Sequence, residues 1–259
     1  DLPPSAKPAM RLSDVVFSGP QGELPCETQT LQQIVRGRGP GQKLNHLLIS
    51  RDEGIARLDA DADVQAIVLR GAGGSFCSGL DLAAFNDTPE PEWLPDFQQI
   101  WRGAHRALFE CSTPLIGAME RYAINGGAAL AIACDYLVVG EKSFLQVGEV
   151  QIGMAAPYNM AWLNLRHSEA VIAQVTLVGD RIAGPELLRL GLATQCVDDA
   201  HVIACATDLA KRMATFPSGT TSKIKRGIRA RLGETGDQWF DRHTQVAGPS
   251  VKPSTMKSR

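Results

Sequence analysis

The sequence lacks several features that would assign it to a whole class of proteins. No apolar run approaches the ~20 residues of a membrane-spanning helix, and the apolar segment AALAIAC is ended by Asp135. The formal net charge is only −2, so the composition provides no general electrostatic attraction for nucleic acid. The opening DLPPSAKPAM lacks the apolar centre of a signal peptide. We therefore expect neither a membrane nor a nucleic acid as partner.

Paired cysteines and clustered metal ligands are also missing. The six cysteines are scattered without a C-x-x-C pair, and most lie in apolar segments, which is typical of reduced, buried thiols. Reduced thiols favour a cytoplasmic location, with an organelle matrix as the alternative. The five histidines are dispersed too, and none forms a zinc-binding pattern with a cysteine. We expect no metal site.

What is present is the pattern of an ordinary α/β protein. The chain has 259 residues, enough for a full core in one or two domains, and 44 % of them are hydrophobic. Short apolar runs predict strands at 14–17, 31–35, 65–71, 114–119, 136–140 and near 193–197. Helical patterns are found near 44–58, 97–110, 128–134, 157–166, 169–178, 184–190, 200–215 and 219–233. Alternation of helices with buried strands favours an α/β fold.

Two glycine-rich turns stand out, FCSGLDL at 76–82 and INGGAAL at 124–130. Each follows a predicted strand and opens a predicted helix. Taken singly, either is explained as a tight turn. Together they can direct one backbone N–H apiece at a single oxygen, which is how an oxyanion hole is built. GAGGSFCSG at 71–79 does not fit the dinucleotide-binding fingerprint.

Three blocks of sequence carry a more specific signal. They are VQAIVLRGAGGSFCSGLDLAAF, TPLIGAMERYAINGGAALAIACDYLVVGEKSFLQVGEVQIGMAAP and GDRIAGPELLRLGLATQCV. In order and spacing they resemble the enoyl-CoA hydratase/isomerase (crotonase) family, well over 60–200 and loosely over 200–235. The resemblance implies a crotonase-like spiral of ββα units with a C-terminal helical region. We expect a core over 1–199, of which 1–45 departs from the family pattern, and a helical region over 200–259.

The resemblance also implies roles for the two turns. The family holds the thioester carbonyl of an acyl-CoA between two backbone N–H groups, and its motif places these on Leu80 and Gly126. Such donors stabilise the enolate-like transition state more than the ground state. Substrate contacts are implied at five further positions, namely Ser78, Asp81, Gly127, Ala129 and Pro157. Asp81 has a plainer interpretation as the cap of the following helix.

The acid–base groups distinguish members of the family. Its hydratases hold water between two carboxylates, and these positions correspond to Ala129 and Glu149. This chain therefore keeps one carboxylate and lacks the other. A single acid suits the family's isomerases, which move one proton between two carbons of the acyl chain. Catalysis by Glu149 requires a partly desolvated site that raises its pKa; the alternative is a surface glutamate at a strand end.

Several alternatives to a one-glutamate isomerase stay open. A hydratase with a second acid from elsewhere, Glu120 being nearest in sequence, is one. A specialised crotonase that forms carbon–carbon bonds by decarboxylation, or hydrolyses thioesters, is another. A non-catalytic relative that binds acyl-CoA or RNA is the rival from another class. The resemblance further implies a homotrimer or a dimer of trimers, with no cofactor beyond the coenzyme A of the substrate.

Other polar and aromatic residues have structural interpretations. Asp135 is expected to be structural, and His105 and His243 to be packing or solvated residues. Trp93, Phe97 and Trp101 have the spacing of core packing, with an acyl pocket as the alternative. A basic helix face is expected to be solvated, or else to contact the phosphates of coenzyme A: Lys223, Lys225, Arg226, Arg229 and Arg231.

Overall fold

Two β-sheets organise the chain. The computed structural model describes residues 14–19, 22–24, 54–71, 74–80 and 95–247, and the structural statements below concern these residues. The large sheet has the order β2-β1-β3-β4-β6-β9. Its strands are β1 (Asp14–Gly19), β2 (Gly22–Leu24), β3 (Ala66–Arg70), β4 (Leu115–Met119), β6 (Tyr136–Gly140) and β9 (Gln195–Val197). β3, β4, β6 and β9 run parallel, whereas β1 is antiparallel to both of its neighbours.

The small sheet has the order β5-β7-β8. Its strands are β5 (Tyr122–Ile124), β7 (Phe144–Gln146) and β8 (Arg181–Ala183). β5 and β7 are parallel, and β8 is antiparallel to β7. The chain thus passes from β4 in the large sheet to β5 in the small one, and returns to the large sheet through β6. These crossings place the ends of β5 and β7 side by side.

Residues 54–60 form a helix that precedes β3. The longer helices are α4 (Phe97–Glu110), α5 (Gly126–Ala133), α6 (Pro157–Asn164), α7 (Glu169–Thr176), α8 (Gly184–Arg189), α9 (Val202–Ala214), α10 (Thr220–Ala230) and α11 (Gly236–Ala247). Two short 3-10 helices are η2 (Glu149–Ile152) and η3 (Asp199–His201). Within the described ranges, no helix is both long and apolar enough to span a bilayer.

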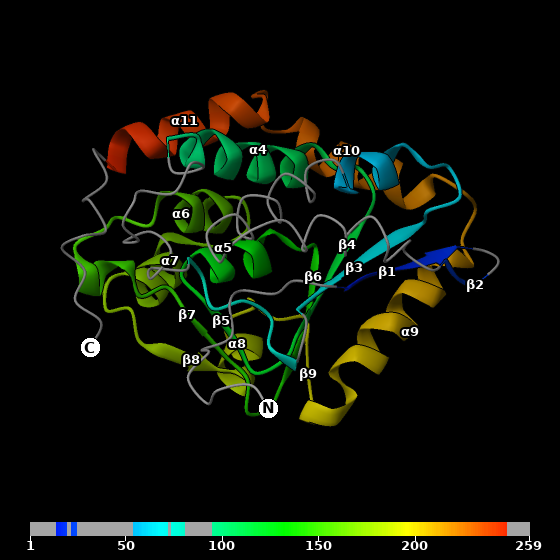
Figure 1. Cartoon of the computed structure of the whole chain (residues 1–259), viewed down its shortest axis with the longest axis horizontal. Helices are drawn as coiled ribbons and strands as arrows, with labels where there is room; N and C mark the ends of the chain where they lie inside the picture. Colours follow the sequence, from blue (N-terminus) through cyan, green and yellow to red (C-terminus); the bar gives the residue numbers. More distant parts are fainter. Residues whose placement is uncertain (1–13, 20–21, 25–53, 72–73, 81–94, 248–259) are drawn as a thin grey trace, which may run out of the picture.

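Helices cover both faces of the large sheet, α9 on one and α4, α5, α6 and α11 on the other (Figure 1). Ala66 and Val68 of β3 share a buried cluster with α9, whose Val202 and Leu209 point into it. Ile67, on the opposite face of the strand, belongs to the larger cluster that includes α4, α5, α6 and α11. This two-residue alternation follows from strand geometry, and burial on both faces explains why β3 is apolar over 66–69, before the half-buried Arg70.

The C-terminal helices are held onto the core by a buried ion pair. The Lys225 ammonium lies 2.6 Å from a carboxylate oxygen of Asp135 and donates to the Thr113 carbonyl at 2.9 Å. Asp135 also accepts from the Leu115 N–H at 2.9 Å. The expected structural role of Asp135 agrees with these contacts. The basic face of α10 is not wholly solvated, because Lys225 is buried.

The α/β pattern read from the sequence is confirmed for most of the described chain. α4 and β6 have the bounds predicted for them, and β3, β4, α6, α7, α9 and α10 agree to within a few residues. The strands β2, β5, β7 and β8, the helix α11 and both 3-10 helices were not predicted. The strand expected at 31–35 and most of the helix expected at 44–58 lie outside the described residues. The boundary proposed near 199 remains a prediction, and α9 beyond it shares a core with the large sheet.

Candidate active site

The two glycine-rich turns lie backbone to backbone. Cys77 of the first turn pairs with the second segment through its N–H to the Tyr122 carbonyl at 3.1 Å and its carbonyl to the Ile124 N–H at 3.0 Å. Gly79 has φ +87°, and a β-carbon there would lie 2.9 Å from the Ile124 carbonyl oxygen. A β-carbon on Gly127 would lie 2.4 Å from the Cys77 carbonyl oxygen. These glycines therefore allow an approach that larger residues would block.

The second turn ends in a helix start. Asn125 links β5 to α5 with φ 52° and ψ −114°, a backbone conformation that is ordinarily glycine's. Gly126 is the first residue of α5, so its N–H has no acceptor within the helix. Leu80 is half-buried at the end of the described part of the first turn. An N–H at a helix start can stabilise a developing negative charge.

Glu149 is the buried carboxylate of this region. It begins η2, three residues after β7 ends, and only 7 % of its surface is exposed. Among the described residues no other Asp or Glu is buried. Burial raises the pKa of Glu149 to about 7, against the lowering effect of hydrogen bonds from its own backbone and from Asn159. The plainer interpretation, a surface glutamate at a strand end, is therefore wrong for this position.

The parallel pairing of β5 with β7 brings Glu149 and the second turn together. Ile124 and Gln146 are the last partners of the two strands, so both chains leave the sheet at the same edge. Immediately beyond, the Asn125 side-chain oxygen accepts from the Gly148 N–H at 2.9 Å. The carboxylate and the N–H of Gly126 are thus carried by adjacent, hydrogen-bonded segments.

The position at which the family resemblance places the second hydratase carboxylate is an apolar one. Ala129 lies in α5 with no exposed surface and belongs to the main core cluster. Of the other residues expected at the site, Gly127 is buried, Ser78 is exposed, and Pro157 is the first residue of α6. Asp81 lies outside the described residues. Whether Ser78, Gly127 and Pro157 contact substrate stays a prediction.

An aromatic cluster borders the second turn. A β-carbon on Gly126 would lie 3.2 Å from two ring carbons of Trp101. The Trp101 ring meets Tyr158 edge-on at 5.8 Å and His105 at 4.3 Å. His105 is fully buried, and its Nδ1 accepts from the Trp162 indole N–H at 2.9 Å. Trp101 therefore packs in the aromatic cluster and also lies against Gly126. An acyl pocket at this place stays a prediction, and Trp93 is outside the described residues.

Asn159 was not predicted from the sequence. It lies in the first turn of α6 and is 1 % exposed. Its side-chain N–H₂ donates to Glu149 Oε1 at 2.8 Å and to the Asn125 carbonyl at 3.2 Å. The available signal was weak: an asparagine two residues after Pro157, in the segment that follows Glu149. A buried side-chain amide needs partners, but the sequence does not say which.

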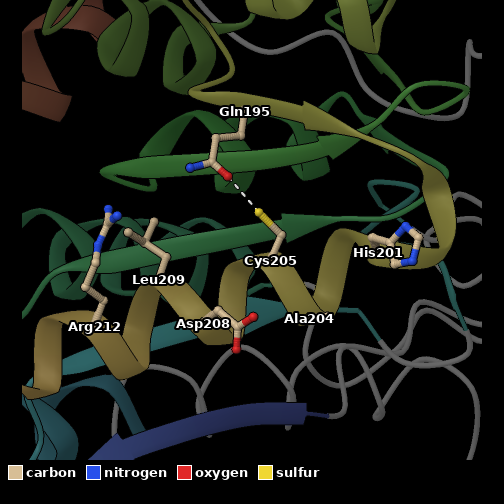
Figure 2. A pocket seen from close by; sticks show the side chains of 7 residues that line it. All are labelled: Gln195, His201, Ala204, Cys205, Asp208, Leu209 and Arg212. Atoms are coloured by element: carbon tan, nitrogen blue, oxygen red, sulfur yellow. Dashed lines mark hydrogen bonds between the residues drawn. The ribbon is translucent and has the colours of Figure 1, made fainter.

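Away from these turns, α9 and β9 line a pocket of about 500 Å³ (Figure 2). Cys205 points there toward Gln195, with its sulfur 2.6 Å from the amide oxygen. None of the residues predicted for the active site lines this pocket. In the described part of the chain, no group of three His, Cys, Asp or Glu side chains is placed to hold a metal ion. The five cysteines described are thiols, and three are buried.

Comparison with known proteins gives a consistent result. A family model described as enoyl-CoA hydratase/isomerase matches residues 50–253. A probable enoyl-CoA hydratase of Mycobacterium leprae is 28 % identical over 207 residues, covering 77 % of this chain and 69 % of the relative. A 1,2-epoxyphenylacetyl-CoA isomerase of Escherichia coli K12 is 25 % identical, with coverages of 73 % and 74 %.

A solved structure extends the comparison to the fold. The crystal structure of an enoyl-CoA hydratase/isomerase from Mycobacterium paratuberculosis superposes with a TM-score of 0.69 at 22 % identity. The match covers 82 % of this chain and 86 % of that one. This likeness confirms the fold class predicted from the sequence.

Proposed function

Since the chain belongs to the enoyl-CoA hydratase/isomerase family, we propose that it shifts the double bond of an enoyl-CoA, using Glu149 as the single proton-transfer group. The thioester carbonyl would lie between the N–H groups of Leu80 and Gly126. Ser78, Asp81, Gly127, Ala129 and Pro157 are the further positions at which we expect the acyl-CoA to make contact.

The proposed reaction moves one proton and conserves the formula of the substrate. The Glu149 carboxylate removes a proton from C2 of a 3-enoyl-CoA, and the electron pair of the C–H bond delocalises onto the thioester oxygen as a dienolate. The two N–H groups stabilise this charge. The Glu149 carboxyl then returns the proton to C4, which leaves a 2-enoyl-CoA. No water enters and no cofactor is consumed.

One observation carries the choice of isomerisation. Glu149 is the only buried carboxylate among the described residues, and the position of the second hydratase carboxylate is the fully buried Ala129. A carboxyl group with a pKa of about 7 can both accept and return a proton near neutrality. Ala129 has no side-chain group that could activate water in the way a second carboxylate would.

Two further expectations belong to this proposal. The substrate's coenzyme A is the only cofactor moiety we expect, and the assembly we expect is a homotrimer or a dimer of trimers. Light scattering of the purified protein tests the second of these: a trimer of 27.8 kDa chains, or a pair of such trimers, is expected, and a monomer would contradict it.

A paired substrate assay tests the reaction. Purified protein is given matched 3-enoyl-CoA and 2-enoyl-CoA, and products are followed by mass and by the absorbance of the conjugated thioester. We expect conversion of the 3-enoyl to the 2-enoyl substrate without gain of mass. Glu149→Gln should lower this rate about 10²–10⁴-fold, whereas Glu141→Gln, at an exposed position, should leave it unchanged.

Each of the other outcomes of this assay would support a different function. Gain of one water by the 2-enoyl substrate would indicate a hydratase with a second acid outside Ala129. Release of free coenzyme A would indicate thioester hydrolysis. Tight binding of several acyl-CoAs without turnover would indicate a binding protein, and retention of activity in Glu149→Gln would overturn the role of Glu149.

A further inference from the structure

We propose that Asn159 is a positioning residue that holds the Glu149 carboxylate and the Gly126 N–H in a single hydrogen-bonded unit. The inference deepens the proposed function, because it takes these two groups as the ones that act on the thioester. Asn159 itself would touch neither the carbonyl nor the migrating proton.

The side-chain amide of Asn159 makes two hydrogen bonds. A side-chain amide carries two N–H donors, and the two acceptors within reach of Asn159 Nδ2 are Glu149 Oε1 at 2.8 Å and the Asn125 carbonyl oxygen at 3.2 Å. The bond to Glu149 is buried and runs to an ionisable acceptor, which makes it the stronger kind. One buried amide group therefore joins the carboxylate to the second turn.

One of these hydrogen bonds acts on the peptide group between Asn125 and Gly126. The Asn125 carbonyl and the Gly126 N–H belong to the same planar trans unit and point in opposite directions. A hydrogen bond that fixes the carbonyl therefore also fixes the direction of the N–H. The Ala129 N–H shares this carbonyl at 3.1 Å. Asn159 and α5 together set where the proposed oxyanion donor points.

A hydrogen bond between Asn125 and Gly148 completes the unit. The side-chain oxygen of Asn125 accepts from the N–H of Gly148, the neighbour of Glu149. The connection therefore runs from Asn125 through Gly148 and Glu149 to Asn159 and back to Asn125. Asn125 and Ala156, which precedes α6, both have positive φ values, 52° and 49°. Strained backbone of this kind persists only where surrounding contacts hold it.

The two oxygens of the Glu149 carboxylate differ in their hydrogen bonds. Glu149 Oε1 is occupied by Asn159, while Oε2 is buried and has no hydrogen-bond partner among the described residues. The same holds for the Asn159 side-chain oxygen. Oε2 is the oxygen available to exchange a proton with a substrate.

The test removes the Asn159 donor and measures the ionisation of Glu149 in the absence of substrate. Asn159→Leu keeps a similar volume without hydrogen bonds, and Asn159→Ala removes the amide group altogether. Carbon-13 NMR of carboxyl-labelled glutamate follows the titration, and Glu149→Gln assigns the signal. Asn164→Leu, exposed in the same helix, is the matched control. Circular dichroism establishes that each variant is folded.

We expect Asn159→Leu and Asn159→Ala to bind the Glu149 proton about tenfold more tightly than the wild type, because a hydrogen bond that favours the carboxylate is lost. Asn164→Leu should titrate as the wild type does. The inference would be overturned by a folded Asn159→Leu or Asn159→Ala protein whose Glu149 titrates as in the wild type.

A second readout uses exchange of the C2 protons of butyryl-CoA with D₂O, followed by mass. Asn159→Leu should lower the maximal exchange rate about 10²-fold, as expected for a small misplacement of reacting groups, with a smaller effect on half-saturation. An unchanged rate would overturn the inference. No exchange or turnover by the wild type would instead overturn the proposed function, while the titration would still decide the role of Asn159.

Discussion

At the scale of single residues, Glu149 shows how local forces set the pKa of a buried carboxyl group. Loss of hydration on burial disfavours the carboxylate, while hydrogen bonds from its own backbone and from Asn159 favour it. The pKa of about 7 that results is close to neutrality. Both protonation states are therefore populated near that pH, as a group that takes and returns one proton requires.

The rate of enoyl-CoA isomerisation should follow the ionisation of this one group. Because the base must be deprotonated to begin the reaction, kcat/KM should rise about tenfold per pH unit below the pKa of about 7 and level off above it. Initial rates from about pH 5 to about pH 9, on either side of that pKa, measure this. A profile without an inflection near neutrality would show that Glu149 is not the base.

At the scale of elements, the contact between the two turns depends on the absence of side chains. Gly127 lies where β5 gives way to α5, and the carbonyl it faces belongs to the backbone of the first turn. A backbone atom cannot rotate away as the end of a side chain can. The separation of the turns, and with it the position of any oxyanion donors, is therefore set by this glycine.

Gly127→Ala should push the two turns apart. The added carbon would lie 2.4 Å from the Cys77 carbonyl oxygen, and overpacking of this kind costs about 1–3 kcal/mol of stability. The stability measured by urea denaturation and the isomerisation rate should both decline.

The matched control is Gly227→Ala in α10, where an added carbon meets nothing within 4 Å. Helix propensity should make this variant about 0.5–1 kcal/mol more stable with unchanged activity. Equal stability of the two variants would contradict the role assigned to Gly127.

Elements also differ in how well the sequence predicts them. Long periodic or apolar segments such as α4 and β6 were predicted with their observed bounds. β2, β5, β7 and β8 were missed because three residues are too few to form a period. β9 is equally short and was predicted only because it follows a helical pattern and a glycine. α11 was missed because its polar sequence carries only a partial apolar stripe, formed by Trp239 and Phe240.

The candidate site divides in the same way. The glycine-rich turns and Glu149 were found from the spacing of family motifs, which sequence displays directly. Asn159 was not, since its role depends on the left-handed turn at Ala156 that folds α6 back over Glu149. A hydrogen bond between side chains on two elements becomes visible only when their relative placement is known.

At the scale of the whole molecule, a buried glutamate such as Glu149 lowers global stability once the pH is high enough for glutamate to ionise in water. A glutamate in water, as in the unfolded chain, has a pKa of 4.5, whereas burial in the folded protein raises that of Glu149 to about 7. Between these values the unfolded chain has lost the proton that the folded chain keeps, so the unfolded state binds fewer protons. The free energy of unfolding therefore falls as pH rises through this interval.

Glu149→Gln should remove this fall in the free energy of unfolding with rising pH. The difference in unfolding free energy between variant and wild type should grow in favour of the variant by about 3 kcal/mol between about pH 4.5 and about pH 8. Denaturation of both proteins at a series of pH values measures the difference, in which the pH dependence of all other groups cancels. A difference that does not change with pH would contradict a raised pKa for Glu149.

The interleaving of the two sheets has a consequence for the order in which the chain folds. β5 and β7 are parallel neighbours, yet α5 and β6 lie between them in sequence, and β6 belongs to the other sheet. The pair can close only after that crossover is in place, because parallel pairing must first overcome the entropy of the intervening loop. During refolding, catalytic competence should therefore return after most of the helical signal has been regained.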